Sequence, residues 1–341
     1  MNKILIVAPA WVGDMVMAQS LLIQLKLDHP QAIIDVVAPS WVLPLLERMP
    51  EVNKAIAMPI SHGQFKLAER YRLGKQLRTE KYDQAFVLPN SWKSALIPFF
   101  AKIPKRTGWL GEMRYGLLND WRKLDKIQFP KMVQRFVALA YPKNQTWSGQ
   151  DYPLPALSIK ASEADAKLAL YQLDLNKPIL ALCPGAAFGP AKRWPTRYFA
   201  EVATKKISQG WQVWIFGSKA EQIFADEIQE LSDNRCINLT GKTSLADMVD
   251  LLSLAQAVVS NDSGPMHIAA SLHRPLVAVY GSSSADFTPP LSNNVIILSV
   301  PDLPCRPCFQ RECPLGHMKC LNDLEPAWVL SAIDTLGTKP L

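Results

Sequence analysis

The acidic residue Asp14 directly follows Gly13 in the stretch PAWVGDMVMAQSLL, which begins where the apolar run ILIVA ends. If that run is a buried strand, Asp14 lies at its carboxyl end, in the turn that opens the next helix. Open α/β sheets bind their ligands at this place, and a carboxylate there can act as a catalytic base. It can equally be a helix-terminal charge that favours the positive end of the helix dipole. Gly13 permits a tight turn or the close approach of a ligand.

A second group of polar residues lies in VVSNDSGPMHIAASL, residues 258–272. This pattern predicts a strand that ends near Asp262 and a helix that starts with Pro265, a residue favoured in the first helical turn. Ser263 and Gly264 would present backbone N–H groups to an anion at the helix N-terminus. Asp262 could accept hydrogen bonds from sugar hydroxyls. His267 would lie within one turn of the anion, although a lone histidine is more often structural.

A third group follows another apolar run in CPGAAFGPAKRWP, residues 183–195. A loop of small residues followed by Lys192 and Arg193 is suited to holding a diphosphate. It can also be a surface loop with two solvated cations, and it lacks the spacing of a Walker A loop. In FGSKAEQ, Glu221 at a further strand end could meet ribose hydroxyls. No G-x-G-x-x-G fingerprint is present, which argues against a nicotinamide enzyme.

Four cysteines lie close together near the end of the sequence, in CRPCFQRECPLGHMKC. They begin with a C-x-x-C pair and are compatible with a structural tetrahedral zinc site. The second spacing is not that of a usual zinc knuckle, so a reduced cysteine cluster or occasional disulfides would explain it nearly as well. The four residues are Cys305, Cys308, Cys313 and Cys320.

Short apolar runs alternate with helical periodicity along the chain, which predicts parallel sheets covered by helices. The pattern occurs twice, with N-cap signals at Ser20 and Ser244. A polar, Pro-rich stretch around residues 143–162 separates the two halves. We therefore predict Rossmann-like domains at 1–155 and 156–322 and a last helix within 323–341. The strands are expected in ILIVAP, IDVVAP, AIAMP, QAFVLP, ILALCPG, QVWIFG, CINLTG, AVVSND, PLVAVYG and VIILSV.

Composition and charge narrow the class of protein. The 341 residues are 48% hydrophobic and 20% charged, as in ordinary globular proteins. Residues 1–160 hold 22 Lys and Arg against 12 Asp and Glu, whereas residues 161–341 hold 15 against 18. The basic first half predicts an anionic partner, such as nucleic acid, anionic lipid or a phosphorylated glycan. No apolar stretch is long enough to span a bilayer and the N-terminus lacks a cleavage site, so we expect a cytoplasmic protein.

Taken together, these stretches resemble the ADP-heptose:lipopolysaccharide heptosyltransferases over nearly the whole chain. The segments that carry the resemblance are PAWVGDMVMAQSL, LPNSWKSALIPFFAKIPKRTGW, RYGLLNDWR, PGAAFGPAKRWP and SNDSGPMHIAASL. The resemblance implies the glycosyltransferase-B architecture, with two Rossmann-like domains facing across a cleft and a C-terminal helix that crosses back to the first. It also implies an inverting, metal-independent transfer, and the sequence has no D-x-D motif for a divalent ion.

The resemblance also implies roles for individual residues. Asp14 would be the general base, and Lys192 would bind the nucleotide phosphates and stabilise the departing ADP. Ala187 and Phe188 differ from the hydroxyl residues of a related branch, which makes phosphate contacts from those side chains doubtful. The donor site would comprise Gly185, Ala187, Phe188, Lys192, Glu221, Thr243, Asp262, Ser263, Gly264 and His267. The acceptor site would comprise Trp11, Gly13, Lys93, Arg106, Arg114 and Arg122.

The expected reaction moves heptose from ADP-heptose to the first heptose of the lipopolysaccharide inner core, on a phosphorylated lipid A–Kdo acceptor. No cofactor and no nucleic-acid partner are expected, and peripheral contact with the inner membrane is compatible with a lipid-anchored acceptor. Two alternatives remain. One is addition of the first heptose to Kdo2-lipid A, and the other is a non-enzymatic, basic nucleic-acid-binding protein with a zinc knuckle.

Overall fold

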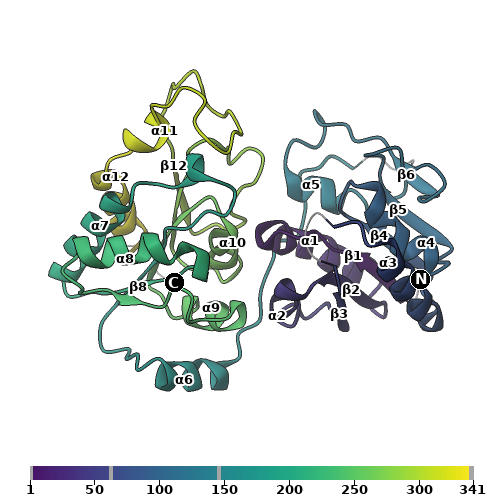
Figure 1. Ribbon diagram of the computed structural model, residues 1–341, viewed down its shortest axis with the longest axis horizontal. Helices are drawn as coiled ribbons and strands as arrows, with labels where there is room; N and C mark the ends of the chain where they lie inside the picture. The colour runs from purple at the N-terminus through teal and green to yellow at the C-terminus, as the bar shows by residue number, and fades with distance from the viewer. Residues whose placement is uncertain (1–2, 61–63, 144–146, 338–341) are drawn as a thin grey trace. The chain divides into compact units, whose positions relative to one another are not determined.

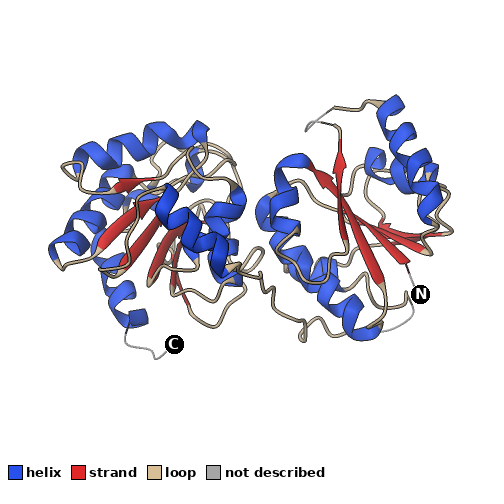
Figure 2. Ribbon diagram, turned by 90° about the horizontal axis from the view of Figure 1, so that it is seen from below, coloured by secondary structure: helices blue, strands red, loops and turns tan. Residues whose placement is uncertain are grey.

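The computed structural model of the chain describes residues 3–60, 64–143 and 147–337. Internal contacts divide the chain into two compact units, Met1–Ala156 and Leu157–Leu341, here called the first and second domains. The division falls one residue after the boundary expected from the sequence. In each domain helices cover both faces of a central sheet (Figure 2).

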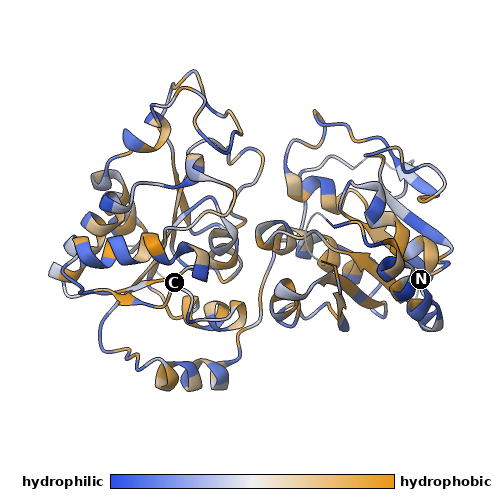
Figure 3. Cartoon of the chain, viewed as in Figure 1, coloured by the Kyte–Doolittle hydropathy of each residue, from blue (hydrophilic) through white to orange (hydrophobic). Residues whose placement is uncertain are grey.

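The sheet of the first domain has six parallel strands in the order β3-β2-β1-β4-β5-β6. The apolar runs fill the central strands, because a strand covered by helices on both faces is buried on both sides. These strands are orange in Figure 3. The strands are β1 (Lys3–Val7), β2 (Ile33–Pro39), β3 (Lys54–Met58), β4 (Gln84–Val87), β5 (Lys105–Trp109) and β6 (Asp120–Arg122).

The helices of the first domain begin with the long helix α1, which contains Asp14 in its first turn. Ser20 lies in the middle of this helix, so its prediction as an N-cap is wrong; the helix begins at Val12, directly after the loop that ends β1. The helices are α1 (Val12–Asp28), α2 (Leu43–Leu46), α3 (Leu67–Leu77), α4 (Leu96–Phe100) and α5 (Met132–Val137), with short 3₁₀ turns η1 (Ser40–Val42), η2 (Arg78–Glu80) and η3 (Trp92–Ala95) (Figure 1).

The second domain repeats this topology, with strands in the order β12-β11-β10-β7-β8-β9, all parallel. Counted from its own first strand, the order equals that of the first domain, and both orders are those of dinucleotide-binding folds. The strands are β7 (Ile179–Cys183), β8 (Gln212–Ile215), β9 (Ile237–Asn238), β10 (Ala257–Asn261), β11 (Leu276–Val279) and β12 (Val295–Leu298).

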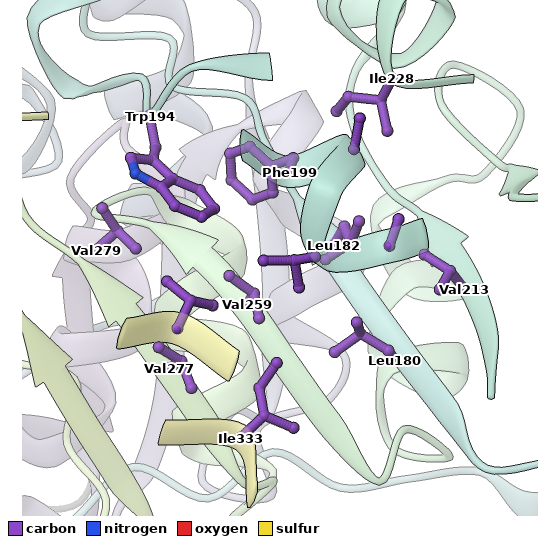
Figure 4. Packing of buried hydrophobic residues seen from close by; sticks show 14 of the residues in the cluster. Leu180, Leu182, Trp194, Phe199, Val213, Ile228, Val259, Val277, Val279 and Ile333 are labelled. Carbon is purple, nitrogen blue, oxygen red and sulfur yellow. The ribbon is translucent and has the colours of Figure 1, made fainter. Parts of the chain in front are cut away.

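Apolar side chains from the strands and helices of the second domain form one continuous core. Figure 4 shows Leu182, Val259 and Val277 of the strands packed with Phe199 of α7 and Ile333 of α12. Ser244 caps α9 as predicted, since its hydroxyl accepts the Asp247 N–H at 3.1 Å. The helices are α6 (Ala161–Leu170), α7 (Thr196–Ser208), α8 (Gln222–Leu231), α9 (Leu245–Leu252), α10 (Gly264–Ser271), α11 (Lys319–Asn322) and α12 (Pro326–Gly337).

The last helix, α12, packs against α7 and the strands β10, β11 and β12. Its buried side chains, Val329, Ala332, Ile333 and Leu336, join the core of the second domain. This helix therefore belongs to the second domain, and a crossing back to the first domain stays a prediction. The described part of the chain contains no helix that is both long and apolar enough to cross a membrane.

The two topologies determine where ligands can bind. In both sheets the chain runs from the first strand toward one edge of the sheet and from the fourth strand toward the opposite edge. This reversal of direction creates a crevice at the carboxyl ends of these two neighbouring strands. In the first domain these strands are β1 and β4, and in the second domain they are β7 and β10. All three polar motifs found in the sequence directly follow one of these strands.

Candidate active site

An ion pair between Lys192 and Asp262 is the centre of the site in the second domain. Lys192 ends the 3₁₀ turn η4 (Pro190–Lys192) beyond β7, and Asp262 directly follows the neighbouring strand β10. Lys192 Nζ lies 2.5 Å from Asp262 Oδ2, and the hydroxyl of Ser283 donates to the same oxygen. Asp262 is 4% exposed, so the lysine compensates a buried carboxylate. The Asp262 carboxylate, predicted to accept hydrogen bonds from sugar hydroxyls, thus binds Lys192 in this structure.

Asn261 holds the loop that carries Lys192 against β10. Its side-chain amide donates to the Pro184 carbonyl at 2.6 Å, and its side-chain oxygen accepts the Trp194 N–H at 3.0 Å. Because Asn261 is fully buried, these bonds satisfy polar atoms that would otherwise be costly to bury. Neither Asn261 nor Ser283 was predicted as a site residue, although Asn261 stands inside the predicted SNDSGP motif.

His267 lies in α10 near the anion-binding end expected from the sequence. It is buried, and this burial lowers its pKa to about 4, against the opposing effect of the Asp262 carboxylate. Near neutral pH the side chain is therefore a neutral imidazole, which can donate or accept a hydrogen bond but brings no positive charge to a phosphate. The N-cap of α10 is Ser263, in extended conformation, with Gly264 and Pro265 following as the first helical residues.

This burial predicts a pH-dependent loss of stability. The pKa of His267 is 6.5 in the unfolded chain and about 4 in the folded chain. The neutral side chain therefore contributes its full share to the free energy of unfolding above pH 6.5, and this share is lost as the pH falls from 6.5 to about 4. We expect the wild-type free energy of unfolding to lose about 2 kcal/mol from this group between about pH 7 and about pH 5. Urea titrations of the wild type and His267→Gln measure it. Equal pH slopes in the two proteins would contradict the assignment.

Glu221 lies at the carboxyl end of β7 and β8, against the backbone of Gly185. A Cβ atom added at Gly185 would lie 1.9 Å from Glu221 Oε1, so only glycine allows this approach. Glu221 Oε2 accepts the Ser218 N–H at 2.7 Å and the Ser218 hydroxyl at 2.9 Å. This holds the carboxylate at the strand end where a ribose would be expected. Thr243, next to the α9 cap, donates its hydroxyl to the Leu239 carbonyl at 3.4 Å.

Phe188, in the loop between β7 and η4, contacts two cations through its ring. Lys192 Nζ lies 5.0 Å and the Arg311 guanidinium carbon 5.6 Å from the centre of its ring. Phe188 therefore positions Lys192 by a cation–π contact. Ala187 beside it is exposed. Both residues lie in the loop expected to approach the donor, with no hydroxyl to offer a phosphate.

The four cysteines of the CRPCFQRECPLGHMKC segment line one small cavity, together with His317. The four thiols thus lie close together, and burial and the thiols of the other three cysteines raise the pKa of Cys320 to about 11. Backbone N–H groups, first that of Met318, lower the pKa of the Cys313 thiol.

Throughout residues 3–60, 64–143 and 147–337, however, no three or more His, Cys, Asp or Glu side chains are arranged to hold a metal ion. The sulfur atoms have different surroundings, since Cys320 is buried in the apolar core and Cys313 lies against the backbone N–H groups of its own turn. A structural zinc ion at these cysteines stays a prediction, beside the alternative of a reduced cysteine cluster.

The cysteine segment binds the backbone of the residues next to the Lys192–Asp262 pair. Arg306 donates to the Gly281 and Ser283 carbonyls at 3.0 and 3.2 Å. The Arg311 carbonyl accepts the Ala191 N–H at 3.0 Å, directly before Lys192. The segment thus fixes the backbone on both sides of the ion pair. This contact was not predicted, because nothing in the spacing of the cysteines indicates it.

Removing Arg306 is expected to loosen the donor site. In Arg306→Gln two carbonyls lose a charged donor, which should lower the free energy of unfolding by about 2 kcal/mol. Because Ser283 then holds Asp262 less firmly, we expect ADP to bind about tenfold more weakly. Calorimetric titration with ADP measures this, with the exposed Lys319→Gln in the same segment as the control. If Arg306→Gln bound ADP as tightly as the wild type, the cysteine segment would have no part in ADP binding and only a structural role.

Asp14 lies in the first domain, at the third position of α1, and is half-buried. Trp11, exposed, is the N-cap of this helix and Gly13 stands in its first turn. The helix begins directly beyond β1, so the carboxylate lies at the carboxyl end of the strand as predicted. Its placement suits a base at the crevice, and its catalytic role stays a prediction.

A cavity of about 180 Å³ opens at the same edge of the first sheet. Residues beyond the ends of β1, β2, β3 and β4 line it, and Lys93 is the one predicted acceptor residue among them. Arg70, which the sequence analysis missed, is 4% exposed and donates to the carbonyls of Phe65, Gln64 and Lys93 at 2.7 to 3.2 Å. It holds the two segments that form the cavity wall.

Two predicted acceptor cations, Arg114 and Arg122, are buried. Arg114 is 0% exposed and donates to the Pro89 and Trp109 carbonyls, and burial lowers its pKa to about 10. Arg122, also buried, donates to the Ala138 and Tyr141 carbonyls. These guanidinium groups are used to join loops of the first domain, so the prediction that they contact the acceptor is corrected.

Arg106 is half-buried and holds the turn before β6 through the carbonyls of Leu117, Ile103 and Gly116. Its guanidinium also lies 5.6 Å from the centre of the Phe99 ring. These contacts give Arg106 a structural role in the first domain, so the prediction that it binds the acceptor is not needed to explain it.

The fold and the site together define an α/β enzyme with two Rossmann-like domains, each with polar residues at its ligand crevice. A family model described as glycosyltransferase family 9 (heptosyltransferase) matches residues 70–319. The chain belongs to this family of glycosyltransferases, which confirms the resemblance, the fold class and the enzyme class predicted from the sequence.

Individual relatives match the chain over nearly its full length. Lipopolysaccharide heptosyltransferase 2 of Salmonella typhimurium is 49% identical, with 98% of both chains covered. Lipooligosaccharide heptosyltransferase 2 of Haemophilus ducreyi is 49% identical, with 98% of this chain and 99% of that one covered. The solved structure of E. coli ADP-heptose LPS heptosyltransferase II is 46% identical, with a TM-score of 0.88 over 99% of this chain and 98% of that one.

Proposed function

We propose that the protein is an inverting heptosyltransferase that moves L-glycero-D-manno-heptose from ADP-heptose to the first heptose of the lipopolysaccharide inner core. The observation that carries the proposal is the likeness, along 98% of both chains, to a lipopolysaccharide heptosyltransferase 2. The anchored lysine at the crevice of the second domain supports a donor with a diphosphate.

In the proposed reaction a hydroxyl oxygen of the acceptor attacks the anomeric carbon of ADP-heptose from the face opposite ADP. Asp14 takes the proton of that hydroxyl, the new glycosidic bond forms, and the bond between the anomeric carbon and the diphosphate oxygen breaks. Lys192 and the N–H groups at the start of α10 stabilise the charge on the departing ADP. The β-linked donor gives an α-linked product.

We place the acceptor sugar at the cavity of the first domain. Lys93 supplies positive charge there for the Kdo carboxylates and phosphates of a lipid A–Kdo–heptose acceptor. The exposed Trp41 also lines the cavity, fixed by its indole N–H to the Ala10 carbonyl at 3.1 Å, and offers a ring face to a sugar. The reaction would then take place in the cytoplasm, at the surface of the inner membrane where a lipid-anchored acceptor lies.

The proposed chemistry needs no metal ion, because a lysine and a helix N-terminus supply the charge that a divalent ion would otherwise provide. A chelator should leave the transfer rate unchanged.

Transfer assays with two acceptors test the proposal. Heptosyl-Kdo2-lipid A should be extended and Kdo2-lipid A should not, with the product masses read by mass spectrometry. Extension of Kdo2-lipid A alone would instead make the protein the enzyme that adds the first heptose. A duplex DNA bound more tightly than ADP-heptose, without any transfer, would favour the nucleic-acid-binding alternative.

A further inference from the structure

We infer that the α3–α4 face of the first domain docks on an anionic lipid bilayer. This face is defined by the exposed apolar residues Phe65, Leu67, Tyr71, Trp92 and Phe99 and by the exposed cations Lys66, Arg72, Lys75 and Lys102. The inference rests on the proposed function only for the place of the acceptor, since a lipid-anchored sugar has to be reached at a membrane surface.

The five apolar residues that define the α3–α4 face are all exposed to solvent. Their side chains are 41–46% exposed. Leu67 and Tyr71 are four residues apart on α3, so they lie on the same side of the helix. The buried residues of α3, which include Leu73 and Leu77, lie on an adjacent side of the helix. Leu67 and Tyr71 thus lie beside the buried side of α3 and remain exposed to solvent.

Ring contacts connect these residues across three elements. The rings of Phe65 and Trp92 lie 5.0 Å apart, which joins the start of α3 to η3. The ring of Tyr71 lies 5.3 Å from Phe100, whose ring is 5.7 Å from that of Phe99 on α4. The helices α3 and α4 pack against each other, as Figure 1 shows. The ring contacts form two aromatic clusters on neighbouring elements, Phe65 with Trp92 and Tyr71 with Phe100 and Phe99, here together called the apolar strip.

The same segment holds the net charge of the whole chain. Residues 64–106 contain ten Lys and Arg and three Asp and Glu, a net charge of +7, which equals the formal net charge of all 341 residues. Glu69, an acidic residue of α3, pairs with Arg72 at 3.0 Å. Lys66, Lys75 and Lys102 are exposed beside the apolar strip. Arg70 of this segment is buried, so the exposed Lys66, Lys75 and Lys102 supply the positive charge at the surface beside the strip.

An anionic bilayer is the partner that fits both properties. Phenylalanine, tyrosine and tryptophan are favoured at the level of lipid headgroups, where they bury their rings among acyl chains. Lysines next to such rings attract anionic headgroups, and stable binding of a peripheral protein usually needs both contributions. A nucleic acid would be attracted by the charge but would give no reason for the aliphatic Leu67 and the Phe99 edge of the strip.

Sedimentation with vesicles tests the inference on the full chain without any substrate. Vesicles of phosphatidylglycerol and phosphatidylethanolamine should bind the protein about tenfold more tightly than phosphatidylcholine vesicles, and added salt should weaken this binding. Lys66→Gln with Lys75→Gln and Lys102→Gln should weaken it about tenfold. Leu67→Ser with Tyr71→Ser should have an effect of similar size.

Matched control variants lie outside the face. Lys126→Gln with Lys177→Gln and Lys205→Gln removes the same charge, and Leu175→Ser with Ile223→Ser removes exposed apolar side chains of the second domain. Both should bind vesicles as the wild type does. All variants should keep the wild-type melting temperature to within a few degrees and the wild-type turnover on a deacylated, water-soluble acceptor.

Equal losses in the control and the face variants, or equal binding to both kinds of vesicle, would overturn the inference. So would a duplex DNA that competes the protein off the vesicles through the same face residues. Vesicle binding through this face with no heptose transfer would leave the docking surface standing and remove the proposed function instead.

Discussion

Replacing Asp14 by asparagine is expected to lower kcat for heptose transfer by about 10²- to 10⁴-fold. Asparagine keeps the shape of the side chain but cannot take the proton of the attacking hydroxyl. Because Asp14 lies in the first domain and the proposed nucleotide site in the second, the affinity for ADP should remain that of the wild type. Steady-state transfer rates and calorimetric titrations with ADP measure the two quantities.

The matched control is Asp28→Asn, which removes a carboxylate from the opposite end of the same helix. It should transfer heptose at the wild-type rate. If Asp14→Asn did the same and only lost up to about 1 kcal/mol of stability, Asp14 would be a helix-terminal charge. The base would then have to be another residue.

Replacing Lys192 by methionine is expected to lower kcat by about 10²- to 10³-fold, since one preorganised positive charge on the departing diphosphate is lost. The same change leaves Asp262 buried without its cation, which should lower the free energy of unfolding by about 3 kcal/mol. Transfer rates and urea unfolding curves measure these two effects, with the exposed Lys205→Met on α7 as the control.

A double variant separates catalysis from stability. Lys192→Met with Asp262→Asn removes both charges of the pair, so most of the stability should return. The transfer rate should stay low, because the positive charge is still missing. Recovery of the rate together with the stability would mean that Lys192 only supports the fold.

The strands that can be predicted from the sequence are those that contain an apolar run, and all ten such runs became strands. The central strands are apolar because helices cover both faces of the sheet, whereas β3 and β12 are only partly buried. The segments β5 (KRTGW) and β6 (DWR) were missed, since their charged residues break the apolar run that identifies a strand. Ser20 shows the same limit for helices: a serine before an apolar stretch resembles a cap, although α1 had begun at Val12.

The residues at the strand ends could be predicted, but not what each one contacts. Lys192 and Asp262 stand 70 positions apart in the sequence and meet because β7 and β10 are neighbours in the sheet. Arg114 was predicted as an acceptor ligand because it lies in RYGLLNDWR, a stretch that resembles the family, yet three-dimensional packing gives its guanidinium group backbone carbonyls to bind. The spacing of the cysteines gave no sign that their segment supports Asp262 through Arg306 and Ser283.

The most direct test of the central claim is the NMR spectrum of the product formed from ADP-heptose and heptosyl-Kdo2-lipid A by the wild-type protein. The proposed mechanism predicts one added heptose, α-linked to the first heptose, at a rate that falls by at least about 10²-fold in Asp14→Asn. A β-linked product, or heptose attached to Kdo, would contradict it.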